Sequence, residues 1–142
     1  MKNSFFIAMV LVLSFSISGL CSDTYNDANQ HIGNWNTIMN EYIGKLKNLD
    51  DLSSVAMTCE AFTTKIESIT PAMKKVRERY PELSNENPPD EMKSLMDENK
   101  DLTIKLNDKL TELMKLANKH SDDQSFQNAF GRLNMAVYKM KR

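Results

Sequence analysis

Apolar residues recur along this chain at alternating intervals of three and four positions, and this spacing constrains the fold more than any other feature. Four such series run through the sequence: Tyr25 to Leu49, Leu52 to Tyr80, Met96 to His120, and Phe126 to Met140. The spacing places each series on one stripe of a helix, and further apolar residues widen the stripes to the face that a four-helix core requires. The sequence therefore predicts an all-α fold.

Polar residues and prolines separate the four series and place the expected helices at about 25–47, 52–80, 88–119 and 122–141. Asp50 is a candidate N-cap for the second helix, Asn87 before Pro88 for the third, and Ser121 with Gln124 forms a capping box for the fourth. Because two of the connections are only a few residues long, neighbouring helices must be antiparallel. We expect an antiparallel up-down-up-down four-helix bundle.

The second and third expected helices are longer than the first and fourth. At about 1.5 Å per residue, the hairpin that they form should extend past its partners by roughly one to three turns. Several apolar side chains would then lie uncovered at that end: Met73, Val76, Tyr80, Met92 and Met96. Pro71 lies within the second helix, either as a kink in one continuous helix or as the start of a new segment capped by Thr70. The stripe keeps its phase across Pro71, which favours the continuous helix.

Residues 1–21 differ in composition from the rest of the chain. Lys2 is their only charge, an almost continuous apolar run extends from Phe5 to Phe15, and small residues follow. This order is typical of a secretory signal peptide, and the run is shorter than the ~18 residues of a membrane-spanning helix. We expect a signal peptide over residues 1–21, an exported bundle domain over residues 22–142 and no transmembrane span. The location would be the periplasm or envelope, or outside the cell if the source is not bacterial.

Two processing routes are open at Cys21. The stretch Ser18-Gly19-Leu20-Cys21 is related to the lipobox of bacterial lipoproteins, although it departs from that pattern in two places. Lipidation would anchor the chain at Cys21. The alternative is ordinary cleavage after Cys21 or Ser22. In both cases Cys59 has no internal disulfide partner, and only a retained, unmodified Cys21 could pair with it.

Positive and negative charges are balanced and interspersed. The chain has 18 basic and 19 acidic residues, so without Lys2 there are 17 and 19, a net charge of −2. Nucleic acid and anionic lipid both require concentrated positive charge, and no basic stripe is present. We therefore expect neither as a partner.

Residue types that carry catalysis are few and scattered. His31 and His120 lie at opposite ends of the expected bundle, more than about 20 Å apart, so they cannot share a metal within one monomer. Cys59 lies in mid-stripe, and neither histidine is placed to activate its thiol. No stripe position is Asp or Glu, and P-loop, zincin and nucleophile-elbow motifs are absent. We expect that the protein is not an enzyme.

Methionine is frequent, and Met73, Met92 and Met96 gather at the expected hairpin end. Flexible thioether side chains often fill irregular core space. They are also soft ligands for Cu(I), and an adaptable methionine-rich groove can hold an apolar segment of a protein partner. The three residues are thus candidate metal ligands, and the hairpin end is a candidate site for a protein partner.

An export signal, four up-down helices, Thr70-Pro71 late in the second helix and the C-terminal stretch Val137-Tyr138-Lys139-Met140-Lys141-Arg142 occur together here. In these features the chain resembles the periplasmic b-type cytochromes that fold as four-helix bundles. In that family, a Met early in helix 1 and a His near the end of helix 4 hold the haem iron. This chain has His31 at the early position and no His in its last helix, so only a reversed pair of His31 with Met140 is conceivable.

A second resemblance rests on the linker. Tyr80-Pro81-Glu82-Leu83 and Pro88-Pro89 are similar to a motif of small exported bacterial proteins. The combined expectation is a non-enzymatic binding or structural protein of the cell envelope, with a haem- or copper-binding periplasmic bundle as the alternative. No cofactor is assigned from the sequence.

Overall fold

A computed structural model describes residues 23–141, and within that range the chain is helical with no strand. The predicted signal peptide and the candidate lipidation site at Cys21 lie outside the described residues. The elements, in chain order, are a short 3-10 helix η1 (Asp23–Tyr25), helices α1 (Asn26–Lys45) and α2 (Leu52–Arg79), a 3-10 helix η2 (Pro81–Ser84), and helices α3 (Asp90–Lys119) and α4 (Gln124–Lys141). Each of the four long helices begins and ends within two residues of its expected range.

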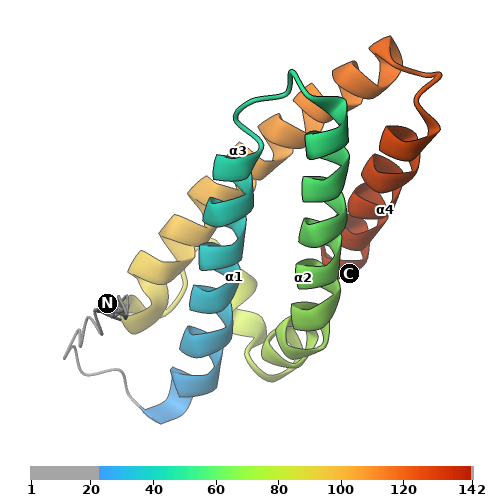
Figure 1. Ribbon diagram of the computed structural model, residues 1–142. Coiled ribbons are helices and arrows are strands. Elements are labelled where there is room, and N and C mark those ends of the chain that lie inside the picture. Colours follow the sequence, from blue (N-terminus) through green and yellow to red (C-terminus); the bar gives the residue numbers. More distant parts are fainter. Residues whose placement is uncertain (1–22, 142) are drawn as a thin grey trace, which may run out of the picture.

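The four helices form the expected up-down-up-down bundle (Figure 1). Helices α1 and α3 run in one direction, and α2 and α4 run in the other. The largest contacts join α2 to α4 and α1 to α3, a smaller one joins α1 to α2, and α3 touches α4 least of these pairs. Helices that run in the same direction therefore pack side by side, and α2 and α3 are not principal neighbours. The connection between them crosses the end of the bundle.

The core follows the predicted stripes closely. Every stripe residue of α4 is buried, and so is every stripe residue of α2 and its C-cap from Val55 to Tyr80. Aromatic rings occupy the centre, where Tyr42 stacks on Phe62 at 4.7 Å between ring centroids. The stripe of α3 is less covered, because Met96, Asn99 and Thr103 are only half-buried.

The expectation of an uncovered hairpin end is wrong for four of its five residues. Met73, Val76, Tyr80 and Met92 are buried, with Met92 only 1 % exposed. The reason is that η2 folds back over this end and buries its own apolar residue, Leu83. Met96, the fifth residue of that set, is only half-buried.

Two predicted N-caps differ from those observed. Helix α2 is capped by Asp51 rather than Asp50, because the Asp51 carboxylate accepts a hydrogen bond from the Ser53 backbone N–H at 3.1 Å. Helix α4 is capped by Asp123 rather than Ser121, since Asp123 Oδ1 accepts from the Phe126 N–H at 3.0 Å. In both cases an aspartate stands directly before the first helical residue, where a side-chain oxygen reaches the free N–H groups.

The third predicted cap is also wrong. Helix α3 begins at Asp90 and its N-cap position is Pro89, with no side-chain hydrogen bond. Pro88 precedes another proline, and the helical region is sterically disfavoured for a residue before proline. The helix therefore starts two residues later than Asn87-Pro88 suggests, with Asp90 and Glu91 near its positive end.

Helix α2 continues through Pro71, as the in-phase stripe predicts. Pro71 has no backbone N–H to donate, and it lies on an exposed face of α2. Thr70, next to it, donates its hydroxyl proton to the Ile66 carbonyl at 2.7 Å. The proline therefore interrupts the hydrogen-bond ladder at a position where water can satisfy the backbone.

Unequal helix lengths leave part of the bundle open. Helix α4 has 18 residues and α3 has 30, which correspond to about 27 and 45 Å. Because α4 runs back along α3 from the far end, it stops well before the beginning of α3. The first part of α3 consequently has no α4 beside it.

Candidate functional site

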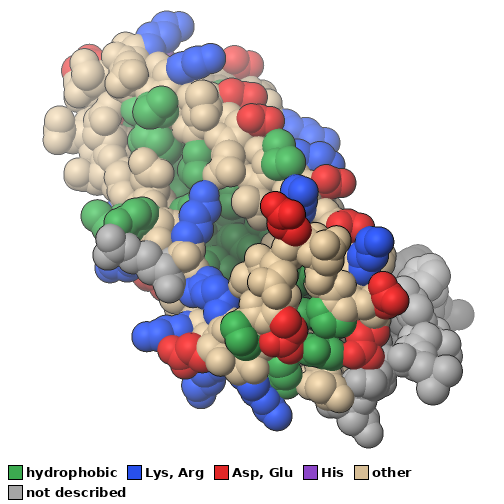
Figure 2. Space-filling model, turned by 180° about the vertical axis from the view of Figure 1, so that it is seen from behind, with side chains coloured by type: hydrophobic (Ala, Val, Ile, Leu, Met, Phe, Trp, Pro, Cys, Tyr) green, Lys and Arg blue, Asp and Glu red, His purple; other side chains and the backbone are tan. Residues whose placement is uncertain are grey.

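An apolar cavity of about 200 Å³ lies where α4 ends. All four long helices and η2 contribute to it. Its apolar lining consists of Ile32 and Trp35 from α1, Met73 and Val76 from α2 with Tyr80 beyond it, Leu83 from η2, Met96 and Leu106 from α3, and Val137 and Met140 from α4. Figure 2 shows a hollow on this side of the molecule with hydrophobic side chains at its floor. The half-buried stripe of α3 therefore faces a cavity.

The structure brings some of the predicted candidate residues together and separates others. Met73, Met96 and Met140 line the cavity from three different helices. Met92 is buried but is not part of the lining, and His31 is half-exposed on α1 and does not reach the cavity. The thioether grouping is therefore Met73, Met96 and Met140 rather than the predicted Met73, Met92 and Met96.

A polar layer joins α1 to α3 beside the cavity. Asn36 is only 3 % exposed, and its amide nitrogen donates to the Leu95 carbonyl at 3.3 Å and to Glu98 Oε2 at 3.2 Å. Asn99, which lines the cavity, donates to Asn36 Oδ1 at 2.7 Å. Asn99 occupies a position in the series from Met96 to His120, whereas Asn36 lies beside its series and no sequence pattern marks it.

Two cations and two hydroxyl groups complete the lining. The hydroxyls belong to Ser84 and Thr103, and the cations are Arg77 and Lys141. Arg77 donates to the Met140 carbonyl, and Lys141 Nζ donates to Asn107 Oδ1 at 3.0 Å. In Figure 2, Lys or Arg side chains stand along one edge of the hollow, and acidic and basic side chains both lie beyond the other. The lining itself contains no Asp, Glu, His or Cys.

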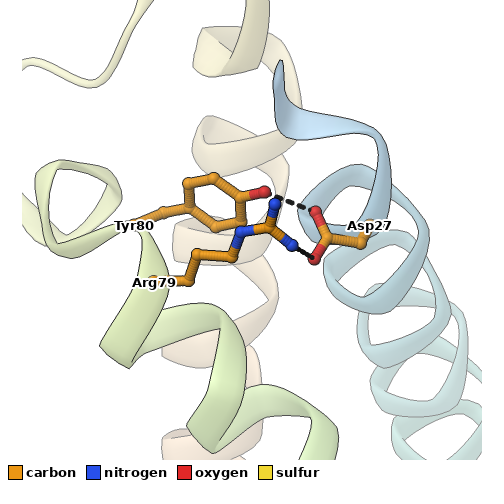
Figure 3. Close-up of polar contacts among 3 residues, drawn as sticks. All are labelled: Asp27, Arg79 and Tyr80. Carbon is orange, nitrogen blue, oxygen red and sulfur yellow. Dashed lines mark hydrogen bonds and ion pairs between the residues drawn. The ribbon is translucent and has the colours of Figure 1, made fainter. Parts of the chain in front are cut away.

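A polar clasp closes the end of the bundle below the cavity (Figure 3). Asp27, near the start of α1, accepts a hydrogen bond from the Tyr80 hydroxyl at 2.6 Å and one from Arg79 Nη1 at 3.0 Å. Tyr25 packs its ring on Tyr80 at 5.2 Å between centroids and donates its hydroxyl proton to Glu82 Oε1 at 2.9 Å. The clasp ties the first turn of α1 to the end of α2 and to η2.

These contacts shift the ionisation of the clasp residues. The hydrogen bond from Tyr80 lowers the pKa of Asp27, and the charge of Arg79 acts in the same direction. The bonds to Asp27 and Glu82 raise the pKa of Tyr80 and of Tyr25, because each hydroxyl must keep its proton to donate. The clasp is thus intact when the carboxylates are charged and the phenols are neutral.

Cys59 lies in the core, away from the cavity lining. Burial raises the pKa of its thiol to about 12, so the reactive thiolate is scarce at neutral pH. Across residues 23–141, no three His, Cys, Asp or Glu side chains are grouped so that they could hold a metal ion. The cavity between the four helices is therefore the feature of residues 23–141 on which we base a functional proposal.

Comparisons of the sequence with protein-family models and curated proteins, and of the structure with solved structures, found no match. In the described part of the chain, no helix is both long and apolar enough to cross a membrane. Over residues 23–141, the fold and the site define an all-α bundle with a half-open apolar cavity at the end of α4, the shortest of its four long helices.

Proposed function

We propose that this chain is an exported, non-enzymatic binding protein that holds a small apolar molecule in its cavity. The observation that carries the proposal is the cavity itself, which has about 200 Å³ of space and ten apolar residues in its lining. An apolar cavity of about 150 Å³ stays dry and takes up benzene, so this one suits a ligand of roughly eight carbon atoms. The composition of residues 1–21 supports export.

The lining also supports binding without catalysis. General acid–base and nucleophilic catalysis depend on His, Cys, Asp, Glu or Lys placed against the reacting atoms. The cavity floor offers thioethers, aliphatic groups and aromatic rings, and the lining contains no Asp, Glu, His or Cys. Its one lysine, Lys141, donates to the Asn107 amide oxygen. Such a surface removes an alkyl or aromatic group from water, which is worth about 0.8 kcal/mol per buried CH₂.

The fluorescence of a tryptophan in the cavity can be used to measure this binding. Trp35 is the only tryptophan and it lines the cavity. We expect 1-octanol to change the emission of Trp35 with a dissociation constant on the order of 0.1 mM. Titration calorimetry checks the same binding without the fluorophore.

A matched pair of variants decides whether the cavity is the site. Thr103 lines the cavity and bonds its hydroxyl to the carbonyl four residues before it, Asn99, and exposed Thr111 on the same helix makes the same bond to Asn107. Thr103→Phe should fill the cavity and abolish octanol binding, whereas Thr111→Phe should leave it unchanged. Equal binding by wild type and Thr103→Phe, with both variants helical by circular dichroism, would contradict the proposal.

Cu(I) binding is a second candidate function. The supporting observation is that thioethers from three helices, Met73, Met96 and Met140, line one cavity, and soft thioether ligands select Cu(I). Haem has less support than copper, because His31 does not reach the cavity. The cavity is also smaller than the roughly 300–1,000 Å³ of pockets for drug-sized ligands.

Isosteric substitutions separate the two candidates. The triple Met→Leu variant at positions 73, 96 and 140 keeps the cavity apolar but removes the sulfur atoms. If the protein binds Cu(I) there, the wild type competes with a bathocuproine chelator for Cu(I) under anaerobic conditions. The triple variant should no longer compete, and it should still bind octanol. The control is the same change at three exposed methionines, Met57, Met114 and Met135. No retention of Cu(I) by the wild type would end the copper candidate.

A further inference from the structure

The two cations beside the cavity are not engaged with carboxylates in the described part of the chain. Lys45, Lys74, Arg79 and Lys109 each form an ion pair there with an acidic side chain. Arg77 and Lys141 instead donate to neutral oxygens, the Met140 carbonyl and the Asn107 amide. Among residues 23–141, neither cation forms an ion pair with a carboxylate, and both lie next to an apolar lining.

Arg77 is well placed to meet a ligand that enters the cavity. Its side chain is half-buried, and it belongs to the lining together with Val76 of the same helix and Val137 of α4. A guanidinium has five N–H donors in a fixed fork, and the bond to the Met140 carbonyl uses one nitrogen, Nη1. Partial burial strengthens a charge-assisted hydrogen bond, so an anion beside Arg77 gains more than it would on an open surface.

From this arrangement we infer that the ligand is a free medium-chain alkyl carboxylate, with its chain in the cavity and its carboxylate at Arg77 and Lys141. The inference rests on the proposed function, because it assumes that the cavity binds an alkyl group. Charge complementarity gives the headgroup, and the cavity volume of about 200 Å³ gives a chain of roughly eight carbon atoms. One carboxylate needs only one or two cations, so the absence of a basic stripe, which excludes an anionic lipid surface, does not exclude a single acid.

Ligands that share one chain and differ in headgroup test the inference. We expect octanoate to bind the protein at least about tenfold more tightly than octylammonium, and more tightly than 1-octanol, at pH 7 and low salt. Acetate, which has the headgroup without the chain, should not bind. Dodecanoate should bind no more tightly than octanoate, because its additional carbons find no room in the cavity.

Charge-removing variants locate the headgroup. Gln can still donate to the carbonyl and amide oxygens, so the double variant Arg77→Gln/Lys141→Gln should keep the fold. It should lose about tenfold or more in octanoate affinity and keep its octanol affinity. The control is Arg132→Gln/Lys139→Gln, which removes two exposed cations of α4 that do not line the cavity.

The outcomes for the two proposals are distinct. If octanol binds but octanoate shows no preference over octylammonium, the carboxylate inference is wrong and the apolar-ligand function stands. The same conclusion follows if the double variant weakens octanol and octanoate equally. If neither ligand binds, both proposals fail. Should the double variant not fold, the comparison of headgroups on the wild type still decides.

Discussion

At the scale of single residues, burial controls the chemistry of Cys59. Its side chain is 0 % exposed, and its raised pKa reflects the cost of placing a thiolate in an apolar core. Oxidation, metal binding and alkylation all require the thiolate in contact with the reagent. In the folded protein, this thiol behaves as a small apolar side chain.

We predict that Cys59 does not react with a disulfide reagent such as dithionitrobenzoate at pH 8 while the protein is folded. The Cys21→Ser variant makes Cys59 the only thiol. The absorbance change should therefore show no reactive thiol per chain in buffer and one per chain in guanidinium. Rapid reaction of a folded sample, with circular dichroism unchanged, would show that the core around Cys59 opens readily.

Asn36 is the residue whose role is least visible in the sequence. It is buried and satisfies three hydrogen bonds, two as donor and one as acceptor, between α1 and α3. Removal of a buried hydrogen-bonding partner leaves the other groups without compensation for their lost hydration. The cost is therefore larger than that of a typical surface change.

We predict that Asn36→Ala lowers the free energy of unfolding by about 1–3 kcal/mol, measured by urea titration. Asn40 is exposed on the same helix and serves as the control. Asn40→Ala should change the free energy by no more than about 0.5 kcal/mol, since alanine has the better helix propensity and no contact is lost. Equal effects of the two substitutions would mean that the polar layer adds nothing to stability.

At the scale of helices, the N-caps show that a polar residue stabilises a helix only when it stands at the right position. Asp51 and Asp123 hold backbone N–H groups of α2 and α4, whereas Asp50 and Ser121 lie one and two residues further out. A carboxylate at an N-cap satisfies an unpaired donor and interacts with the positive end of the helix. Neighbouring polar residues lack that geometry.

We predict that Asp51→Ala and Asp123→Ala each cost about 0.5–2 kcal/mol of stability. Asp50→Ala and Ser121→Ala should each stay within about 0.5 kcal/mol of the wild type. Urea midpoints of the four variants, compared at equal slope, measure the difference. A larger loss for Asp50→Ala than for Asp51→Ala would place the α2 cap at Asp50 after all.

At the scale of the whole molecule, the polar clasp connects stability to pH. Asp27 has a lowered pKa, so its contribution is present above its ordinary value of 3.8 and is lost as pH falls below it. Tyr80 has a raised pKa, so its contribution is present below its ordinary value of 10.0 and is lost as pH rises above it. Between these limits the clasp holds α1 to the end of α2.

We predict that Tyr80→Phe destabilises the protein at pH 7 and that the difference from wild type shrinks at pH 3 and at pH 10.5. The ring remains in the core, so the change reports the hydrogen bond to Asp27. Tyr42→Phe, at another buried tyrosine, is the control and should show no such pH pattern. Urea midpoints at the three pH values measure the effect; a difference that stays constant with pH would assign the loss to packing alone.

The fold class, the helix ranges and most of the core were predictable from the sequence. The reason is that helical periodicity is a local property: a residue at position i shares a face with those at i+3 and i+4 whatever the rest of the chain does. The buried residues from Val55 to Tyr80 and from Phe126 to Met140 illustrate this. The continuity of α2 through Pro71 followed from the same rule.

Only the tertiary structure decided which stripes meet. Direct contact of α2 with α4 and of α1 with α3 depends on side-chain packing between distant segments, which periodicity does not encode. That arrangement buried the end that we expected to be open, brought Met140 rather than Met92 beside Met73 and Met96, and left a cavity where α4 ends. The regular spacing of apolar residues thus determined that four helices form, and their packing determined where the molecule has room for a ligand.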